Sequence, residues 1–526
     1  MVNTASPSLS SNTAYFPTDI ERLLAARREL DATAFRTLGL PTLMQVGLCL
    51  SIDTDGGVDA SRFQDMYTMW SSVIYGEICT QFLESWRREL FAEGADDFGS
   101  TDDATVLRAI SAAAELRFLS SWKDRLAELR SVFSDPSRGY PAQGADFYAF
   151  CVLMAIYGTL FDLGPYILFT FTREISDIHI DGITMTLVAA KGQTYRATLP
   201  SFPSVTEQLN HAHEYARLYG KRFDAGVAHE NLNSSHFHRL ALRRDTTIFS
   251  GFTGAYRIQL LDNPTAQSMV DSGYITPEAM NFLQRCVEAE VPILVAGEAG
   301  SAKTTLLRAL ARSIARNEPI LTVEESPELF LRMALDEDGR KYFSNVHDHI
   351  IQTSANGDSI GFADILKWAL QESCRRMIVG EIPSGEIMSQ FLTALSGHGS
   401  GMATLHASDI DNVIPRVTTL LSAYGVPQAT AWSQIQDNLA VVVHAQLQRT
   451  NAGIQRFVTA IGWVVPNPAS ADAPPKILHA FTRNPAGQLT QSAESVRVIR
   501  NLREAEQRTK GVAGPQELNP QILVTA

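Results

Sequence analysis

The N-terminal part of the chain has the apolar spacing of helices. Apolar residues recur every three to four positions in the segments 20–38, 63–91 and 104–133, which places them on one face of a helix. Polar residues separate these segments. The pattern predicts a helical bundle over residues 18–145, after a loose tail at residues 1–17. We find no chemical motif in this part.

Residues 148–171 are almost wholly apolar, and the length of this run approaches that of a membrane span. Two features disfavour a span. Asp162 lies inside the run, where a carboxylate in the middle of a bilayer is costly, and the pair Gly164-Pro165 would break a helix. Two buried segments joined at Gly164-Pro165 are the better interpretation, with a membrane span as the less favoured alternative.

The pattern changes near Asp177. Short runs of alternating apolar and polar residues follow, punctuated by Gly182 and Gly192, and then comes a helical stretch at 205–218. This mixture predicts an α+β domain over residues 146–263.

Residues 264–450 alternate between strand-like and helix-like patterns. Such alternation is typical of an α/β fold in which helices cross over between parallel strands. Residues 451–526 are predicted to form a C-terminal extension that ends in a loose tail rich in Pro, Gly and Gln.

The composition narrows the possible functions. The 526 residues contain 44 Lys and Arg against 57 Asp and Glu, a formal net charge of −13, which disfavours a protein that coats nucleic acid. Five scattered cysteines without a C-x-x-C pair argue against a disulfide framework and a zinc site, and favour a reducing compartment. The N-terminus lacks the charged and apolar regions of a secretory signal.

One segment has the pattern of a phosphate-binding loop. The apolar run 292–296 predicts a buried strand, and a helical pattern begins near Leu306. Between them, backbone N–H groups and a helix N-terminus could bind phosphate, while an ordinary strand-to-helix turn is the plainer alternative. The candidate binding residues are Gly297, Gly300, Ser301, Ala302, Lys303, Thr304 and Thr305.

Three segments further along the chain carry acids or histidines after apolar runs. The first contains Glu324 and Glu325, the second ends in Glu381, and the third is a glycine-rich loop with His398 and His406. Acids at the carboxyl ends of parallel strands lie in the crevice where open α/β sheets bind ligands. Each segment alone is weak, because strand-end acids are more often solvated loop residues.

Together and in this order, the four segments resemble the secretion ATPase superfamily, which comprises the motors of type II and type IV secretion, type IV pili and tight-adherence pili. They resemble its Walker A loop, Asp box, Walker B strand and His box. Segments 163–182, 220–224 and 273–278 also resemble family motifs, so the similarity covers about residues 150–465. The tight-adherence branch, whose members carry an N-terminal helical bundle, fits best. The resemblance implies a RecA-like P-loop motor domain.

The resemblance also implies a role for each matching residue, with ATP and Mg²⁺ as cofactors. Lys303 and Thr304 would bind phosphate and Mg²⁺, and Glu381 would hold the water shell of the metal. Glu324, with Glu325 beside it, would be the general base for the attacking water.

Other roles concern the neighbourhood of the nucleotide. His398 and His406 would link the nucleotide site to the interface between subunits. Arg257 would extend from the preceding domain over the γ-phosphate.

The sequence departs from the family pattern at five positions. Ala302 replaces the last glycine of the loop, Pro383 and Gln371 stand where arginines are usual, and Cys374 replaces a proline. His236 occupies the position of a second arginine finger. Missing arginines predict slow turnover, because arginine supplied to the γ-phosphate accelerates phosphoryl transfer by orders of magnitude.

The resemblance implies a cytoplasmic, homohexameric ATPase that powers pilus assembly or type II/IV secretion. It would be peripheral at the cytoplasmic membrane and contact an inner-membrane platform protein. The alternative is a nucleotide-binding scaffold of a secretion machine with little or no turnover. A nucleic-acid translocase of related fold is disfavoured by the acidic charge and by the lack of a basic and aromatic stripe, so we expect no direct nucleic-acid binding.

Overall fold

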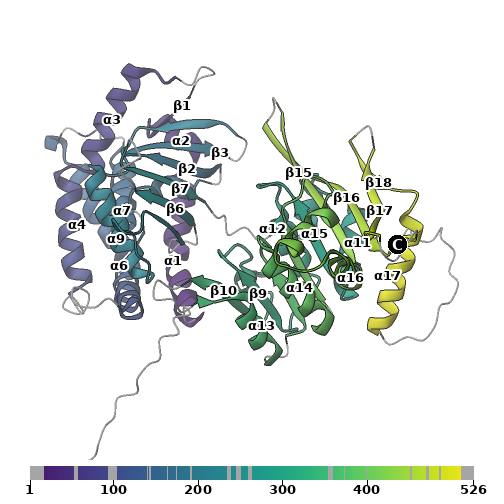
Figure 1. Cartoon of the computed structure of the whole chain (residues 1–526). Helices are drawn as coiled ribbons and strands as arrows, with labels where there is room; N and C mark the ends of the chain where they lie inside the picture. Colours follow the sequence, from purple (N-terminus) through teal and green to yellow (C-terminus); the bar gives the residue numbers. More distant parts are fainter. Residues whose placement is uncertain are drawn as a thin grey trace, which may run out of the picture. The chain divides into compact units, whose positions relative to one another are not determined.

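The chain forms two compact units that divide near Leu260 (Figure 1). Each unit is considered separately below. The computed structural model describes residues 17–52, 57–92, 103–138, 140, 144–162, 164–172, 174–189, 192–233, 238–244, 250–258, 264–353, 359–371, 374–398, 400–450, 453–468, 473–484 and 487–510.

The first unit begins with helices, as the apolar spacing predicts. The run at 63–91 forms two helices rather than one, and the break falls at Gly76, where a Cβ would lie 1.9 Å from the carbonyl oxygen of Ser72. The helices of this unit are α1 (Pro17–Thr37), α2 (Leu40–Gln45), α3 (Ala60–Ile74), α4 (Glu77–Leu90), α6 (Ala104–Phe133), the 3-10 helix η1 (Pro136–Arg138), α7 (Ala145–Phe161), α8 (Ile167–Thr170) and α9 (Val205–Leu218).

The apolar run at 148–171 is interior structure. Helices α7 and α8 are separated at Gly164, which has a φ of 87°, and most of their side chains are buried. Asp162 is buried as well, and its Oδ1 accepts a hydrogen bond from the hydroxyl of Tyr256 at 3.0 Å. In the described part of the chain, no helix is both long and apolar enough to cross a membrane.

A seven-stranded antiparallel sheet completes the first unit, with the order β1-β4-β3-β2-β7-β6-β5. Its edge strand β1 lies within the region predicted as a helical bundle and pairs with β4. The strands are β1 (Cys49–Ser51), β2 (Ile175–Asp181), β3 (Thr184–Ala189), β4 (Thr194–Ala197), β5 (His229–Asn233), β6 (Arg239–Arg244) and β7 (Phe252–Arg257). One hydrophobic core runs from α1 to β7, so the bundle and the α+β region, which we predicted as separate domains, share a core.

The second unit is built on a nine-stranded sheet with the order β10-β9-β13-β14-β8-β15-β16-β17-β18. The pairs from β10 to β15 are parallel, and those from β15 to β18 are antiparallel. The strands are β8 (Ile293–Gly297), β9 (Ile320–Glu324), β10 (Val346–Ile350), β13 (Arg376–Val379), β14 (Ser400–Leu405), β15 (Val441–Thr450), β16 (Gly453–Val465), β17 (Lys476–Arg483) and β18 (Leu489–Gln491), with a separate pair β11 (Gln352–Thr353) and β12 (Ser359–Ile360).

Helices cover both faces of this sheet, as the alternation along β8 shows. Ile293 and Val295 point into a core with α11, α12 and α17, whereas Leu294 and Ala296 point into a core with α13 to α16. The helices are α10 (Ala266–Asp271), α11 (Pro277–Glu288), α12 (Lys303–Ala311), the 3-10 helix η3 (Leu331–Met333), α13 (Phe362–Gln371), α14 (Gly385–His398), α15 (Val413–Ala423), α16 (Gln428–Asn438) and α17 (Ser495–Lys510). This confirms the predicted α/β, RecA-like P-loop fold.

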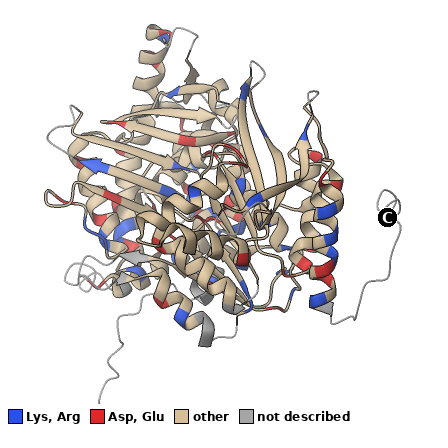
Figure 2. Cartoon of the chain, turned by 45° about the vertical axis from the view of Figure 1, so that its right-hand side comes forward, with Lys and Arg blue, Asp and Glu red and all other residues tan. Residues whose placement is uncertain are grey.

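The residues after 450, which we predicted as an extension, continue the same sheet. Strands β16 to β18 add to it, and α17 packs on α11, where Arg285 pairs with Glu506 at 2.9 Å. Along α17, at the right of the view, basic and acidic residues are interspersed (Figure 2).

Candidate functional site

The loop between β8 and α12 has the backbone conformation of an anion-binding turn. Gly297 has a φ of 150°, and a Cβ there would lie 2.1 Å from the carbonyl oxygen of Ala445. Gly300 has a φ of 75°. Ala302 is also left-handed, with φ 66° and ψ 32°, a conformation that costs a residue with a Cβ about 1–2 kcal/mol. The loop therefore needs stabilisation from its surroundings at Ala302.

Lys303 opens α12 and points back into the loop. Its Nζ donates to the carbonyl oxygens of Gly297 at 3.0 Å and Glu298 at 2.8 Å. Burial lowers the pKa of Lys303, while the nearby carboxylates of Glu381, Glu328 and Glu298 act in the opposite direction. From this position, the ammonium group of Lys303 could also contact a phosphate bound in the loop.

Thr304, the next residue of α12, contacts a carboxylate that the sequence had not singled out. Its Oγ1 donates to Oε2 of Glu328 at 3.1 Å. A hydroxyl and a carboxylate are oxygen ligands of the kind that Mg²⁺ prefers, with water and phosphate completing its shell. In the described segments, no group of three or more His, Cys, Asp or Glu could hold a metal ion by itself.

Glu324 and Glu325, at the end of β9, differ in their surroundings. Glu324 is buried, and its Oε1 accepts hydrogen bonds from the backbone N–H groups of Glu328 at 2.9 Å and Leu329 at 3.0 Å. Burial raises the pKa of Glu324 to about 8, although these two hydrogen bonds act to lower it. Glu325 is exposed.

Glu381 follows β13, the strand beside β9, and is half-exposed. Its Oε1 lies 3.0 Å from Nε2 of His406, which follows β14. The residue before it, Gly380, allows a close approach, since a Cβ there would lie 2.9 Å from Oε1 of Glu324. The ends of β9, β13 and β14 therefore bring Glu324, Glu381 and His406 together.

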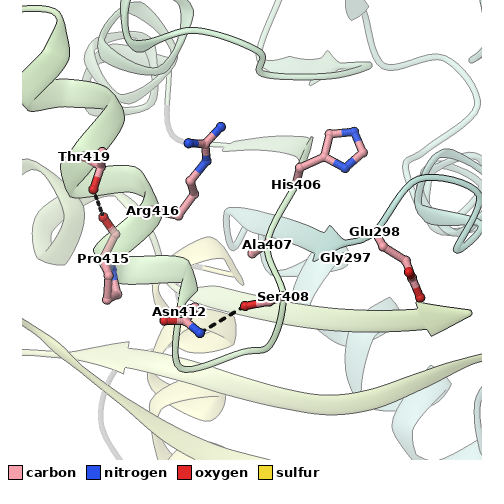
Figure 3. A pocket seen from close by; sticks show the side chains of 9 residues that line it. All are labelled: Gly297, Glu298, His406, Ala407, Ser408, Asn412, Pro415, Arg416 and Thr419. Atoms are coloured by element: carbon pink, nitrogen blue, oxygen red, sulfur yellow. Dashed lines mark hydrogen bonds between the residues drawn. The ribbon is translucent and has the colours of Figure 1, made fainter.

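A cavity of about 500 Å³ adjoins the start of the loop and is lined by Gly297, Glu298, His406, Ala407, Ser408, Asn412, Pro415, Arg416 and Thr419 (Figure 3). Arg416 projects from α15, and His406 projects from the segment after β14. The wall between them is fixed by a hydrogen bond from Nδ2 of Asn412 to Oγ of Ser408 at 3.0 Å.

Comparison with known families identifies this part of the chain. Residues 247–473 match the family model of type II/IV secretion system proteins. In this region the chain is similar to the secretion ATPase superfamily.

Its relatives match over part of their length. The chain is 29% identical to the type IV secretion system protein PtlH of Bordetella pertussis over 230 residues, which are 42% of this chain and 62% of PtlH. It is 29% identical to VirB11 of Brucella suis over 195 residues, 36% of this chain and 51% of VirB11. The chain thus spans less than two thirds of these relatives.

Solved structures also align with it. The VirB11 ATPase of the Brucella suis type IV secretion system, in complex with sulphate, is 20% identical and aligns over 55% of this chain and 89% of its own, with a TM-score of 0.30. The pilus retraction motor PilT with bound ADP is 17% identical and aligns over 64% and 86%, with a TM-score of 0.40.

The remaining predicted site residues lie elsewhere or outside the described part. Arg257 is on β7 of the first unit, where its Nε donates to Oδ1 of Asp177 at 3.0 Å. His398 ends α14, but its side chain lies outside the described residues, as does His236 altogether.

The departures from the secretion ATPase pattern are described in part. Pro383 is exposed after Glu381, and Cys374 is buried. Gln371 ends α13, and its side chain lies outside the described part.

Three residues around the loop escaped the sequence-based prediction. Glu328 lies four residues after Glu324, but nothing in the sequence distinguished it from a solvated acid. Tyr274 donates its hydroxyl hydrogen to the carbonyl oxygen of Ser301 at 3.0 Å, and Arg456 donates from Nε to that of Gly300 at 2.7 Å. Both lie far from the loop in sequence, and although Tyr274 falls within segment 273–278, nothing in that segment indicated a contact with the loop.

Proposed function

We propose that this protein is an ATPase motor that powers pilus assembly or type II/IV secretion. The observation that carries the proposal is the gathering of four features at one edge of the parallel sheet. These are the left-handed loop after β8, the Thr304–Glu328 pair, buried Glu324 and the Glu381–His406 pair. Ligands of open α/β sheets bind at this edge.

The loop would bind the phosphates of ATP. Its backbone N–H groups and the N-terminus of α12 offer partial positive charge, and Lys303 offers a full charge to the β- and γ-phosphates. Thr304 and Glu381 would hold Mg²⁺, directly or through its water shell, with Glu328 beside Thr304. When bound, Mg²⁺ neutralises charge that develops on the phosphates.

Glu324 would act as the general base. In this role its carboxylate accepts a proton from water as the water oxygen forms a bond to the γ-phosphorus and the bond to the β–γ bridging oxygen breaks. The pKa of about 8 means that Glu324 binds protons well at neutral pH, and that it must lose its own proton before each cycle. Its exposed neighbour Glu325 lacks this environment.

The proposal also includes the oligomeric state of the protein and its branch within the family. We propose a homohexamer of the tight-adherence branch, on the support of the N-terminal helices α1 to α7 and of the motifs upstream of the loop. Arg257, His398 and His406 would act where domains and subunits meet. The protein would work in the cytoplasm, peripheral at the membrane, on a polytopic platform protein.

Light scattering tests the ring. With Mg²⁺ and a non-hydrolysable ATP analogue at tens of micromolar protein, we expect a mass of six subunits. A chain that stays monomeric under these conditions would count against a motor. Pro383 and Gln371, which stand where arginines are usual, favour the second candidate, a scaffold that binds ATP without turnover, because arginine at the γ-phosphate accelerates the chemical step. A hexamer that binds ATP and releases no phosphate would establish the scaffold instead.

A further inference from the structure

Two side chains that are far apart in the sequence contact the backbone carbonyl oxygens of the phosphate loop. Tyr274 lies between α10 and α11, before the sheet begins, and Arg456 lies on β16, after the parallel strands. The hydroxyl of Tyr274 contacts the carbonyl oxygens of Ser301 at 3.0 Å and Ala302 at 3.4 Å. The guanidinium of Arg456 contacts the carbonyl oxygen of Gly300 at 2.7 Å.

Hydrogen bonds connect the segments that carry these two side chains to each other and to the loop. The backbone N–H of Val458 on β16 donates to the carbonyl oxygen of Tyr274 at 2.8 Å, which fixes the strand to the segment that carries the tyrosine. Tyr274 is buried, and burial raises the pKa of its hydroxyl, which therefore keeps its proton and remains a donor. On the other strand of the hairpin, the backbone N–H of Leu447 donates to Oε1 of Glu298 at 2.9 Å.

These contacts determine where the loop's N–H groups point. In a trans peptide, the C=O of one residue and the N–H of the next point in opposite directions. When Tyr274 holds the carbonyl of Ser301, the N–H of Ala302 is directed away from Tyr274. Because the same hydroxyl also contacts the carbonyl oxygen of Ala302, both peptide planes that flank Ala302 are oriented, which favours its left-handed φ of 66°. The same contacts thus oppose relaxation of a residue that has no glycine freedom.

We propose that Tyr274 and Arg456 are positioning residues that hold the phosphate loop in its binding conformation and thereby compensate for alanine at position 302. This inference rests on the proposed ATP-binding function of the loop. Neither residue is proposed to contact the nucleotide. Their effect is on the fraction of molecules whose loop is ready to bind.

The test is a double-mutant cycle. Tyr274→Phe removes only the hydroxyl, and Arg456→Gln removes the cation. We call the contacts that Tyr274 and Arg456 make with the loop the brace. Each substitution is combined with Ala302→Gly, because glycine adopts the left-handed conformation without the brace. The control Tyr342→Phe removes a similar bond, from the Tyr342 hydroxyl to the carbonyl oxygen of Arg312 at 2.6 Å, away from the loop.

Two measurements read the cycle. The first is hydrogen exchange of the peptide 297–305 in the full chain without nucleotide. The second is KM and kcat for ATP. Tyr274→Phe should speed exchange and raise KM about 3- to 10-fold, with kcat changed less than about twofold, because bound phosphate itself orders the loop. With glycine at position 302, the same substitution should cost less than half as much on a logarithmic scale.

The outcomes are distinct. If both brace variants behave like Tyr342→Phe, or if their cost is the same with alanine and glycine at position 302, the proposal is wrong. If Tyr274→Phe does not fold, Arg456→Gln carries the same cycle. If exchange follows the prediction but no form of the protein binds ATP, the brace stands and the proposed function fails. If ATP binds and Lys303→Ala abolishes binding, but Tyr274→Phe and Arg456→Gln have no effect, the ATP-binding function stands and only the positioning role of the brace is wrong.

Discussion

The parallel strands of the second unit end in two different kinds of candidate binding group, one made of backbone atoms and the other of side chains. After β8, the groups that would meet phosphate belong largely to the backbone, and their direction depends on the left-handed residues Gly300 and Ala302. After β9 and β13, the chemistry resides in the carboxylates of Glu324 and Glu381. A backbone site tolerates a change of residue type if its conformation is held. A carboxylate site does not tolerate the loss of its charge.

The largest effect should come from the end of β9. Glu324→Gln keeps the side chain's shape and its acceptor for the N–H groups of Glu328 and Leu329, but it removes the base. ATP should still bind, while hydrolysis falls at least about a hundredfold. The matched control is Glu325→Gln, at the exposed neighbour, which should stay within about twofold of the unmodified rate. If Glu325→Gln causes the loss and Glu324→Gln does not, the base is assigned one residue off.

The next effect concerns pH. A general base must be deprotonated to act, and the pKa of Glu324 is raised to about 8. We therefore expect kcat/KM, which reports the free enzyme, to rise about tenfold per pH unit below this value and to level off above it. A base with the ordinary pKa of a glutamate would give a plateau above about pH 5–6. A flat profile between pH 6 and 8 would contradict the assignment of Glu324.

A smaller effect should distinguish Glu328 from the two strand-end acids. Glu328→Gln can still accept the hydrogen bond from Thr304, but it lacks the charge beside the predicted metal ligand. The Mg²⁺ concentration needed for half-maximal hydrolysis should rise about tenfold, on the scale of a charge-assisted contact. Titration with Mg²⁺ at saturating ATP measures it, and no change would leave Glu328 a purely structural partner of Thr304.

The smallest effect should come from the backbone site. Ala302→Gly removes the cost of a Cβ at a φ of 66°. Turnover of the unmodified protein should be slow, below about 1 s⁻¹, and the substitution should raise kcat/KM about 3- to 10-fold, mainly by lowering KM, the factor that corresponds to about 1 kcal/mol. Rapid turnover of the unmodified protein, with Ala302→Gly neutral or harmful, would mean that our reading of the departures as losses is wrong.

The sequence predicted the site best where the chemistry is local. The spacing of Gly297, Gly300, Lys303 and Thr304 after an apolar run was sufficient to predict the loop, and the acids after β9 and β13 were found at their strand ends. The left-handed conformation of Ala302 is consistent with the glycine that is usual at this position.

What the sequence could not predict depends on contacts between distant segments. The raised pKa of Glu324 depends on burial beside Gly380, and the support of the loop depends on Tyr274 and Arg456. Likewise, the shared core of the first unit could not be foreseen, because the strand β1 that joins the helical region to the sheet has only three residues. Periodicity does not detect so short a strand.

The most direct test of the central claim is steady-state phosphate release by the purified full chain with Mg²⁺ and ATP, compared with Lys303→Ala. Lys303 supplies the one full charge that points into the loop from α12, and its loss should weaken ATP binding about tenfold or more. We predict slow, Mg²⁺-dependent release by the unmodified protein and much less by Lys303→Ala. Equal phosphate release by the two proteins would contradict this claim.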